Sequence, residues 1–435
     1  MKILIVGNGG REHAIAWKLS NSSSFKNSES LLYCTLGNPG IDKLATPVKL
    51  NPLDIKDITQ FVINEQIDLV VIGPEVPLSL GLADTLLYQT NAKVFGPSKS
   101  AAEIETSKVY AKDFMQRYGI PSASYKSFNK DNYTEVENYL DNISFPAVIK
   151  ADGLAAGKGV YIAVDKSDSV KFINDITTAK IFGDSGASFI IEEFLEGFEL
   201  SVFVVTDGKD YVILPAAQDH KKIGEGDTGK NTGGMGAYSP ADKLISDNIF
   251  KKIKNEIIEP ALIGLDKDGR IFKGCLYCGL MIVNENPYVI EFNCRFGDPE
   301  TQAVLPLIKS DFLELLISVA DNSINNYKLE TYDKFSACVV AASKGYPDNF
   351  EKGKEIHGLD SLDSDALVFH SGTLIENGKI VSSGGRVLSI VCSSDVSIHD
   401  SLSKTYNNIN KIRFDNIYYR KDIGRKFSEL IKNKI

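Results

Sequence analysis

The chain has 435 residues, 43% hydrophobic and 24% charged, so at about 150 residues per domain it is long enough for two to four domains with buried cores. Its 48 Lys and Arg against 57 Asp and Glu give a net charge of −9, which argues against a nucleic-acid or membrane-surface binder. No apolar run reaches the roughly 18–20 residues of a membrane span, no signal peptide is visible, and six cysteines do not make a disulfide framework. We therefore expect a cytoplasmic protein.

The first part of the chain predicts a doubly wound α/β domain with a parallel sheet. Residues 2–6 (KILIV) form a short apolar strand that ends in Gly7-Asn8-Gly9-Gly10, and a helical stretch follows. Asp68–Ile72 and Val94–Phe95 each end at a Gly-Pro pair, as buried parallel strands often do. We expect this domain to cover residues 1–103, with ligands at the carboxyl ends of its strands.

The middle of the chain mixes helices, strands and hairpins, which predicts an α+β domain at residues 104–330. A small subdomain at about 122–194 carries a glycine-rich flap. The turns Asp207-Gly208 and Asn284-Glu285-Asn286 each predict a hairpin. The expected helices are Ser107–Tyr118 and Ser167–Lys180, and the expected strands are Ala147–Ala151, Val160–Val164, Phe189–Glu193, Glu199–Thr206, Tyr211–Leu214, Cys275–Val283 and Tyr288–Asn293.

The last part predicts a strand-rich α+β domain at residues 331–435. Its expected strands are Ala337–Ala342, Leu367–Ile375 and Val387–Val391, and its expected helix is Ile398–Ile409. The whole chain is thus an α/β and α+β multidomain protein.

The first motif with chemical meaning is Gly7-Asn8-Gly9-Gly10-Arg11-Glu12. Backbone N–H groups in a glycine-rich turn at a helix N-terminus bind phosphate, and Arg11 favours a phosphate-bearing small molecule. Glu12 stands where a dinucleotide-binding fingerprint needs glycine, which disfavours a dinucleotide oxidoreductase. A tight turn without a ligand remains the alternative.

The second motif runs from Lys150 to Gly159 and contains three glycines and two adjacent alanines. It is not a P-loop, because Gly159 follows Lys158 where that pattern needs Ser or Thr. Small residues beside two lysines suit a mobile flap that closes over a polyphosphate. A plain exposed hairpin loop is the alternative.

The third motif is the acidic stretch from Glu192 to Glu199, where a strand runs into a connector. A connector offers backbone donors and acceptors to an adenine edge, and a carboxylate at Glu199 can bind two ribose hydroxyls. Taken alone, the pattern is more typical of solvated acids at a strand end.

The fourth motif places Glu291 and Asn293 two positions apart on an expected strand. Such residues share a face about 7 Å apart, with Phe292 pointing into the core. Two oxygen ligands plus phosphate oxygens suit Mg²⁺, and Arg295 on the same face can neutralise a transferring phosphoryl group. A buried polar pair with a salt bridge is the alternative.

Other candidates are weaker. Cys275 and Cys278 form a CxxC, but on one strand they would face opposite sides, and no second pair completes a zinc site. His220 lies in a charged, glycine-flanked segment, and the small residues from Asn231 to Ala237 suit close approach to a ligand.

The order of these motifs resembles the ATP-grasp superfamily of carboxylate–amine ligases. Within it, the blocks VGNGGREHAIAWK, KADGLAAGKGV, GDTGKNTGGMGAYSP, EFNCRFGDPETQ and YRKDIG are similar to the family that joins glycine to 5-phosphoribosylamine in purine biosynthesis. The resemblance implies ATP-dependent formation of glycinamide ribonucleotide, ADP and phosphate through a glycyl phosphate. It also implies a divalent cofactor, Mg²⁺ (or Mn²⁺), with ATP as co-substrate.

The resemblance also implies roles for individual residues. Glu291 and Asn293 would bind the metal, and Arg295, Lys150 and Asp219 would be catalytic. ATP would be bound by Lys108, Lys150, Gly157, Lys158, Gly159, Glu192, Glu193, Phe194, Leu195 and Glu199. The other substrates would be bound by Gly9, Gly10, Arg11, Glu12, Gly73, Pro74, Glu75, Lys221, Thr232, Gly233, Gly234, Met235, Arg295 and Asp298.

One position departs from the superfamily pattern. Many members carry a further acidic metal ligand about 13 residues before the glutamate of the pair, and that position is Cys278 here. Glu291 would then bear the larger share of metal binding.

Two other functions stay open at this point: another ATP-grasp carboxylate–amine ligase acting on a different small acid or amine, and a non-catalytic nucleotide-binding regulator. The expected partners are ATP, glycine and 5-phosphoribosylamine, with no nucleic acid and no membrane. A monomer is favoured. The chain ends about eleven residues past YRKDIG, which suggests a stand-alone enzyme.

Overall fold

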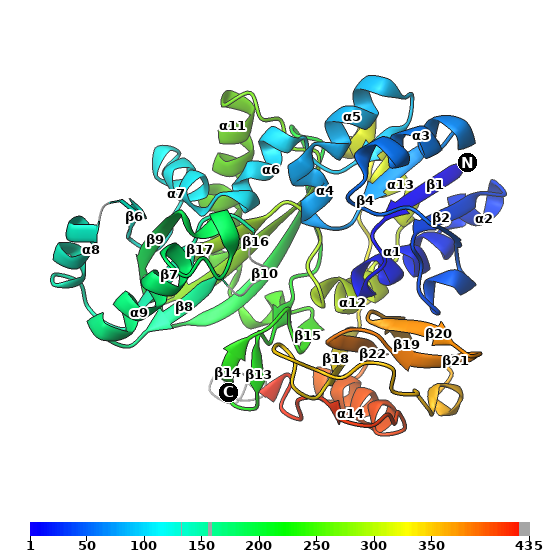
Figure 1. The fold of residues 1–435 in the computed structure, drawn as a ribbon. Helices are drawn as coiled ribbons and strands as arrows, with labels where there is room; N and C mark the ends of the chain where they lie inside the picture. Colours follow the sequence, from blue (N-terminus) through cyan, green and yellow to red (C-terminus); the bar gives the residue numbers. More distant parts are fainter. Residues whose placement is uncertain (132, 155–158, 426–435) are drawn as a thin grey trace.

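The computed structural model describes residues 1–131, 133–154 and 159–425. Figure 1 shows an N-terminal part at the upper right, an elongated central part at the left and a C-terminal part at the lower right. In these described stretches, no helix is long and apolar enough to cross a membrane.

The N-terminal part is built on a parallel sheet with the strand order β3-β2-β1-β4-β5. The strands are β1 (Lys2–Val6), β2 (Leu31–Thr35), β3 (Thr46–Val48), β4 (Leu69–Ile72) and β5 (Lys93–Phe95). The helices are α1 (Gly10–Ser20), α2 (Ser23–Asn27), α3 (Ile55–Glu65), α4 (Glu75–Leu80), α5 (Leu82–Gln89) and α6 (Lys99–Thr106). Every side chain of β4 is buried, as expected when helices cover both faces of a sheet. The predicted doubly wound domain is confirmed.

Two antiparallel sheets, ordered β11-β10-β16-β17 and β6-β9-β7-β8, make the central part. The first contains β10 (Phe198–Thr206), β11 (Tyr211–Ile213), β16 (Gly274–Val283) and β17 (Asn286–Asn293). The second contains β6 (Tyr125–Asn129), β7 (Ala147–Ala151), β8 (Val160–Ala163) and β9 (Ser188–Glu193). Both predicted hairpins, β10–β11 and β16–β17, are confirmed.

Helices flank these two sheets (Figure 1). They are α7 (Lys108–Arg117), α8 (Tyr133–Leu140), α9 (Lys166–Thr177), α10 (Asp247–Lys252) and α11 (Glu259–Lys267), with a π-helical stretch at Ile253–Ile258. Two further helices pack elsewhere: α12 (Glu300–Val304) contacts α1, and α13 (Phe312–Ala320) contacts β5. The expected helices at Ser107–Tyr118 and Ser167–Lys180 correspond to α7 and α9, each within three residues at its ends.

The C-terminal part is built on a sheet ordered β12-β15-β18-β22-β19, with β23 paired to β18. The middle and the end of the chain both contribute strands to this sheet. Its strands are β12 (Gln218–Asp219), β15 (Gly236–Ser239), β18 (Phe335–Ser343), β19 (Leu367–His370), β22 (Arg386–Ser394) and β23 (Ile417–Tyr418), and α14 (Ile398–Ile409) packs on it. Because β12 and β15 come from the middle of the chain, this sheet unites both sides of the boundary expected at residue 331. That boundary stays a prediction.

Two small hairpins complete the fold: β13 (Lys222–Gly224) with β14 (Thr228–Asn231), and β20 (Thr373–Glu376) with β21 (Lys379–Ser382). The sequence pattern predicts one strand over Leu367–Ile375, and this is wrong, because β19 and β20 belong to different sheets. Between them, Gly372 packs so closely that a Cβ there would lie 2.5 Å from the Cα of Gly384. The local alternation of apolar and polar residues does not reveal a contact between two glycines that lie apart in the sequence.

A pair of buried histidines joins helix α1 to the C-terminal sheet. The backbone N–H of His370 donates to Nδ1 of His13 at 2.8 Å, so the His13 ring is neutral there. The edge of His13 also packs on Phe369. Burial, assisted by His370 and Lys43, lowers the pKa of His13 to about 3, and burial with Lys43 lowers that of His370 to about 4.

We expect the thermal unfolding midpoint to fall when the pH is lowered from 7 to 5. Both histidines titrate near pH 6.5 when exposed, so acid protonates only the unfolded chain in this range and favours unfolding. The stabilisation is complete above the exposed pKa of 6.5 and is lost as the pH falls toward about 4 for His370 and about 3 for His13. His13→Asn keeps an acceptor for His370 without titrating, so calorimetry should show a smaller fall; an equal fall would contradict this account.

Candidate active site

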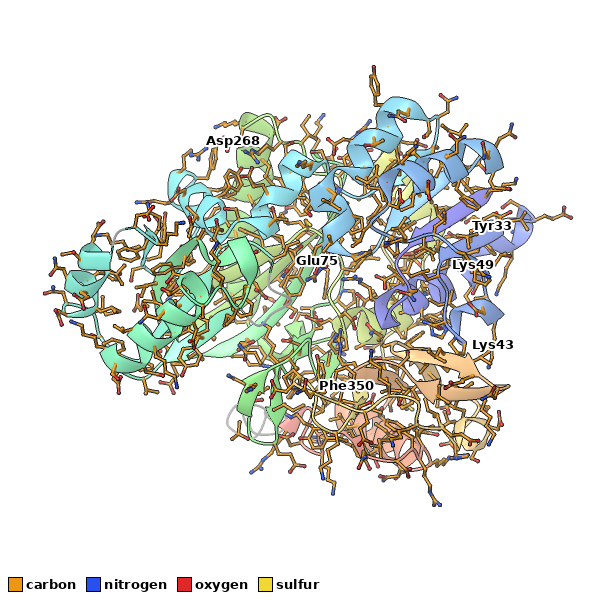
Figure 2. The ribbon with its side chains drawn as sticks, viewed as in Figure 1. Tyr33, Lys43, Lys49, Glu75, Asp268 and Phe350 are labelled. Atoms are coloured by element: carbon orange, nitrogen blue, oxygen red, sulfur yellow. The ribbon has the colours of Figure 1, made fainter. Side chains whose placement is uncertain are left out.

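A cleft of about 990 Å³ opens where the central part meets the other two. Its walls come from α7, β7, β9, β10 and β17, and from the segments around β12. Glu75, one of its lining residues, lies near the centre of the molecule (Figure 2). The expected site residues that line the cleft are Arg11, Glu75, Lys108, Lys150, Gly159, Glu192, Glu193, Phe194, Leu195, Glu199, Asp219, Lys221, Thr232, Gly233, Glu291, Asn293, Arg295 and Asp298.

Two lysines share one buried carboxylate in this cleft. Glu192, whose side chain is 1% exposed, lies 3.0 Å from Nζ of Lys150 and 3.3 Å from Nζ of Lys112. Lys150 also donates to the carbonyl of Ile290 at 2.8 Å. Burial lowers the pKa of Lys112 to about 8 although Glu192 raises it. The Glu192 carboxylate therefore holds two ammonium groups of the cleft in place.

Lys112 is a residue that the sequence analysis misses. It lies one helical turn after Lys108 on α7, so a search for i, i+4 partners on the same helix face would find it.

Helix α7 is also tied to the start of the glycine-rich motif. The carboxylate of Asp152 accepts the backbone N–H of Lys108 at 2.6 Å, and Nζ of Lys108 donates to the carbonyl of Gly153. Burial lowers the pKa of Lys108, while nearby carboxylates raise it. Gly157 and Lys158 lie outside the described residues, so the predicted flap over a polyphosphate stays a prediction.

The expected metal pair lies on β17 with its side chains toward the cleft. Glu291 and Asn293 line the cleft, whereas Phe292 between them is buried in the core. The Glu291 side chain is 41% exposed and lies 3.7 Å from Nζ of Lys221. Its pKa is lowered, because Lys221, Lys150 and Arg295 together outweigh the effect of burial.

The register between β16 and β17 shows where Cys278 lies relative to the pair, while its departure from the superfamily pattern stays a prediction. That residue pairs with Phe292 and is fully buried, whereas Gly279 pairs with Glu291 and faces the same side. Cys275 packs in a different core cluster from Cys278, so the two thiols do face opposite sides of β16. The described residues contain no group of three His, Cys, Asp or Glu side chains able to hold a metal. A cation at Glu291 and Asn293 would therefore need oxygen ligands from a bound nucleotide.

Arg295 follows the pair and is held by two carboxylates. Its guanidinium donates to Glu75 at 3.2 Å, to Glu105 at 3.0 Å and to Oδ1 of Asn293 at 3.2 Å. Arg295 and then Arg11 offset the effect of burial and lower the pKa of Glu75 to about 2. Glu105, which also accepts the N–H of Cys294, is a second residue that no local motif reveals.

The side chain of Glu12 occupies the glycine-rich turn before α1. The carboxylate of Glu12 accepts the N–H of Gly9 at 2.7 Å and Nε of Arg11 at 2.6 Å. Arg11 also donates to the carbonyl of Phe296, which turns it toward the large cleft. The position expected for a phosphate at this turn therefore already holds an anionic group.

The remaining residues expected at the sugar-phosphate site, from this turn and from the Gly73-Pro74 pair, do not line the large cleft. Gly9, Glu12 and Pro74 line a separate pocket of about 330 Å³. Gly10 and Gly73 pack closely against other side chains: a Cβ would lie 2.5 Å from Ser371 Oγ or 2.2 Å from Glu12 Oε1, respectively. Their predicted contact with a sugar phosphate stays a prediction.

The segment around β12 supplies further polar groups. Lys221 lies 3.3 Å from Glu199 and 3.9 Å from Asp219. Burial raises the pKa of Asp219, and the surrounding carboxylates, Asp219 first, raise that of Lys221 against the effect of burial. Thr232 and Gly233 also line the cleft, but Gly234 and Met235 do not, and Met235 is fully buried.

Arg386 of β22 is a third residue missed by the sequence analysis. It donates to Oδ2 of Asp298 at 2.8 Å and to the carbonyl of Gly233. It brings the C-terminal part into the cleft, and no spacing in the sequence connects it with these partners, 88 and 153 residues away.

Paired antiparallel sheets around a lysine-lined cleft with a carboxylate–amide pair define the ATP-grasp class of enzymes, and the model for the phosphoribosylglycinamide synthetase ATP-grasp (A) domain matches residues 106–301. The models for the N and C domains of the same synthetase match residues 1–105 and 336–426. The chain belongs to the phosphoribosylglycinamide synthetase family.

Known proteins agree with this assignment. A phosphoribosylamine–glycine ligase of Caldanaerobacter subterraneus subsp. tengcongensis is 45% identical over 98% of this chain and 99% of its own length. The crystal structure of a phosphoribosylamine–glycine ligase from Thermotoga maritima is 34% identical, covers 97% of this chain and all of that one, and has a TM-score of 0.84. A Campylobacter jejuni biotin carboxylase, 16% identical over 99% and 96% of the two chains with a TM-score of 0.73, shares the fold.

We expect Glu192→Gln to lower the free energy of unfolding by about 3–5 kcal/mol, because it leaves two buried ammonium groups without their carboxylate. Urea denaturation followed by circular dichroism measures the change. Glu193→Gln is the matched control, since this neighbouring side chain is exposed and accepts the hydroxyl of Ser124. Equal stabilities of the two variants would contradict the role of Glu192.

Proposed function

We propose that this chain joins glycine to 5-phosphoribosylamine to give glycinamide ribonucleotide, with cleavage of ATP to ADP and phosphate. It is an ATP-dependent ligase that forms a C–N bond, as its family is. The proposal is carried by one observation: a single cleft contains the lysines of α7 and β7, the Glu291–Asn293 pair and a polar wall at Asp219 and Lys221.

ATP would lie along the central sheets. Lys108 and Lys150 would bind its phosphates, since both ammonium groups are already held toward the cleft. The segment from Glu193 to Leu195 would bind adenine through its backbone, and Glu199 would bind the ribose. Gly157, Lys158 and Gly159 would close over the phosphates and exclude water, which would hydrolyse the reactive species.

Glu291 and Asn293 would hold one divalent cation, Mg²⁺ or Mn²⁺. Enzymes of this class use ATP and a divalent metal ion, and one carboxylate with one amide oxygen is a donor set that Mg²⁺ accepts when phosphates supply the rest. The ion would neutralise charge between the triphosphate and the carboxylate of glycine.

The chemistry needs two steps, because the carboxylate of glycine is a poor electrophile. Transfer of the γ-phosphoryl group to it would give glycyl phosphate, a good acylating agent. The amine of 5-phosphoribosylamine would then attack the carbonyl carbon, forming the C–N bond and releasing phosphate. Lys150 and Arg295 would stabilise the charge on the transferring group, and Asp219 would face the reacting amine.

The second substrates would be bound at the junction of the three parts. Arg11, Glu75, Lys221, Thr232, Gly233 and Asp298 line this region of the cleft. We further propose a cytoplasmic monomer, supported by six free, buried cysteines among the described residues and by the net charge of −9.

The test of this function is a co-substrate assay. With MgATP, glycine and freshly prepared 5-phosphoribosylamine, we expect ADP release only when both co-substrates are present, and mass spectrometry should detect glycinamide ribonucleotide. ADP release with another small acid in place of glycine would replace this proposal with a different ATP-grasp ligase. No ADP release with any acid would contradict a ligase function.

We expect Glu291→Gln to lower kcat by about a hundredfold or more, because the metal would lose its only carboxylate ligand from the chain. Raising Mg²⁺ should recover part of the activity. Glu285→Gln, in the exposed turn of the same hairpin, is the matched control and should keep normal kinetics. Full activity of Glu291→Gln at limiting Mg²⁺ would contradict the metal role.

A further inference from the structure

One wall of the cleft is anchored at both ends by β12 and β15 in the C-terminal sheet, but its middle is a hairpin outside that sheet. This wall, residues 218–236, carries Asp219, Lys221 and Thr232, and its middle is the small β13–β14 hairpin. Those two strands form a sheet of their own. An isolated two-stranded hairpin is at best marginally stable in water, so contacts from outside must fix where it lies.

A buried set of such contacts is made by Arg420, near the end of the described chain. Its side chain is only 1% exposed. Nη1 donates to Oδ1 of Asp227 at 2.9 Å and to the carbonyl of Lys222 at 3.0 Å. Nε and Nη2 donate to the two carboxylate oxygens of Asp422 at 2.8 and 2.7 Å. One guanidinium thus joins the hairpin to the segment 418–424.

The rest of the segment 418–424 contacts the same wall. The hydroxyl of Tyr418 donates to the carbonyl of Ile223 at 2.7 Å, and Asp422 accepts the N–H of Gly226 at 2.8 Å. The N–H of Gly424 donates to Nε2 of His220 at 3.2 Å. The segment 418–424 is thus hydrogen-bonded to β13, to the hairpin turn at Gly226 and to His220, which precedes Lys221.

The turn of the hairpin depends on this anchoring. Gly226 and Asp227 have φ values of +68° and +56°, in the left-handed region. For Asp227 this backbone costs free energy, and its carboxylate is the group bound by Arg420. The contact therefore stabilises a turn conformation that the hairpin would otherwise leave.

A buried guanidinium between two carboxylates is a poor general stabiliser, because desolvation cancels much of its attraction. It is an effective positioning device, since its donors form a rigid fork and any displacement leaves a buried charge unpaired. The function proposed above does not use this group, although Arg420 lies in the YRKDIG block.

We propose that residues 418–424 form a clasp that holds the cleft wall in its substrate-binding geometry, with Arg420 as the positioning residue. The clasp acts through the wall on the site for glycine and 5-phosphoribosylamine, whereas the lysines that would bind the phosphates of ATP lie outside the wall, on α7 and β7. The identity of those substrates rests on the proposed function, whereas the clasp itself is a structural property.

The test compares Arg420→Met and Arg420→Lys with the wild-type chain. In Arg420→Met we expect KM for glycine or 5-phosphoribosylamine to rise roughly tenfold to a hundredfold, as for small displacements of binding groups, with KM for ATP changed by no more than about twofold. Hydrogen exchange should accelerate at residues 222–231 and stay unchanged in the N-terminal sheet. Arg420→Lys should recover part of both effects.

Arg413→Met is the matched control, because Arg413 lies in the same part of the chain with an exposed side chain and should behave as wild type. If Arg420→Met does not fold, Tyr418→Phe removes one clasp hydrogen bond while keeping the ring, and should show a smaller change in the same direction. Unchanged exchange at 222–231, or an equal rise of all three KM values with faster exchange throughout, would overturn the clasp. A wild-type chain without glycine-dependent ADP release would refute the proposed function, while the exchange measurement would still decide the clasp.

Discussion

Charge pairing inside the cleft is the constraint on which the rest of the site depends. Cations that can bind a triphosphate must be kept in place when no nucleotide is bound, and a buried ammonium or guanidinium without a partner is strongly unfavourable. The chain meets this requirement with carboxylates: the buried Glu192 pairs with Lys112 and Lys150, and the buried Glu105 and the half-buried Glu75 pair with Arg295. The cations are therefore oriented before any ligand arrives, which reduces the entropy lost on binding.

Strand β17 fixes the relative positions of three of the polar groups in the cleft, as its alternating side chains and its register with β16 show. Glu291 and Asn293 alternate with the core residue Phe292, so both reach the cleft from one face. The pairing with β16 shifts by one residue beside Ile290, which lies between the paired Val289 and Glu291. Its carbonyl accepts a hydrogen bond from Nζ of Lys150, and one strand thereby positions both the expected metal ligands and a lysine that we propose binds phosphate.

Much of the framework follows from local sequence. Apolar runs and turn residues predict β1, β7, α14 and both central hairpins, since strand and helix periodicity is a local property. The partners of Arg295, Asp298 and Asp227 cannot be predicted in this way. Glu105, Arg386 and Arg420 meet them across more than 80 residues of chain, and only the tertiary fold determines such contacts. The glycine-rich turn shows the same limit, because spacing alone does not reveal that the Glu12 side chain fills it.

The site also shows why three parts of the chain must act together. Glu75 from the N-terminal part binds Arg295, and Arg386 from the C-terminal part binds Asp298, three residues further along the same loop. Both outer parts thus hold one short segment that directly follows the Glu291–Asn293 pair. A rotation of either part would move this segment and, through the hydrogen bond from Arg295 to Asn293, the expected metal site. The geometry for phosphoryl transfer is accordingly a property of the junction between the three parts, rather than of the ATP-grasp sheets alone.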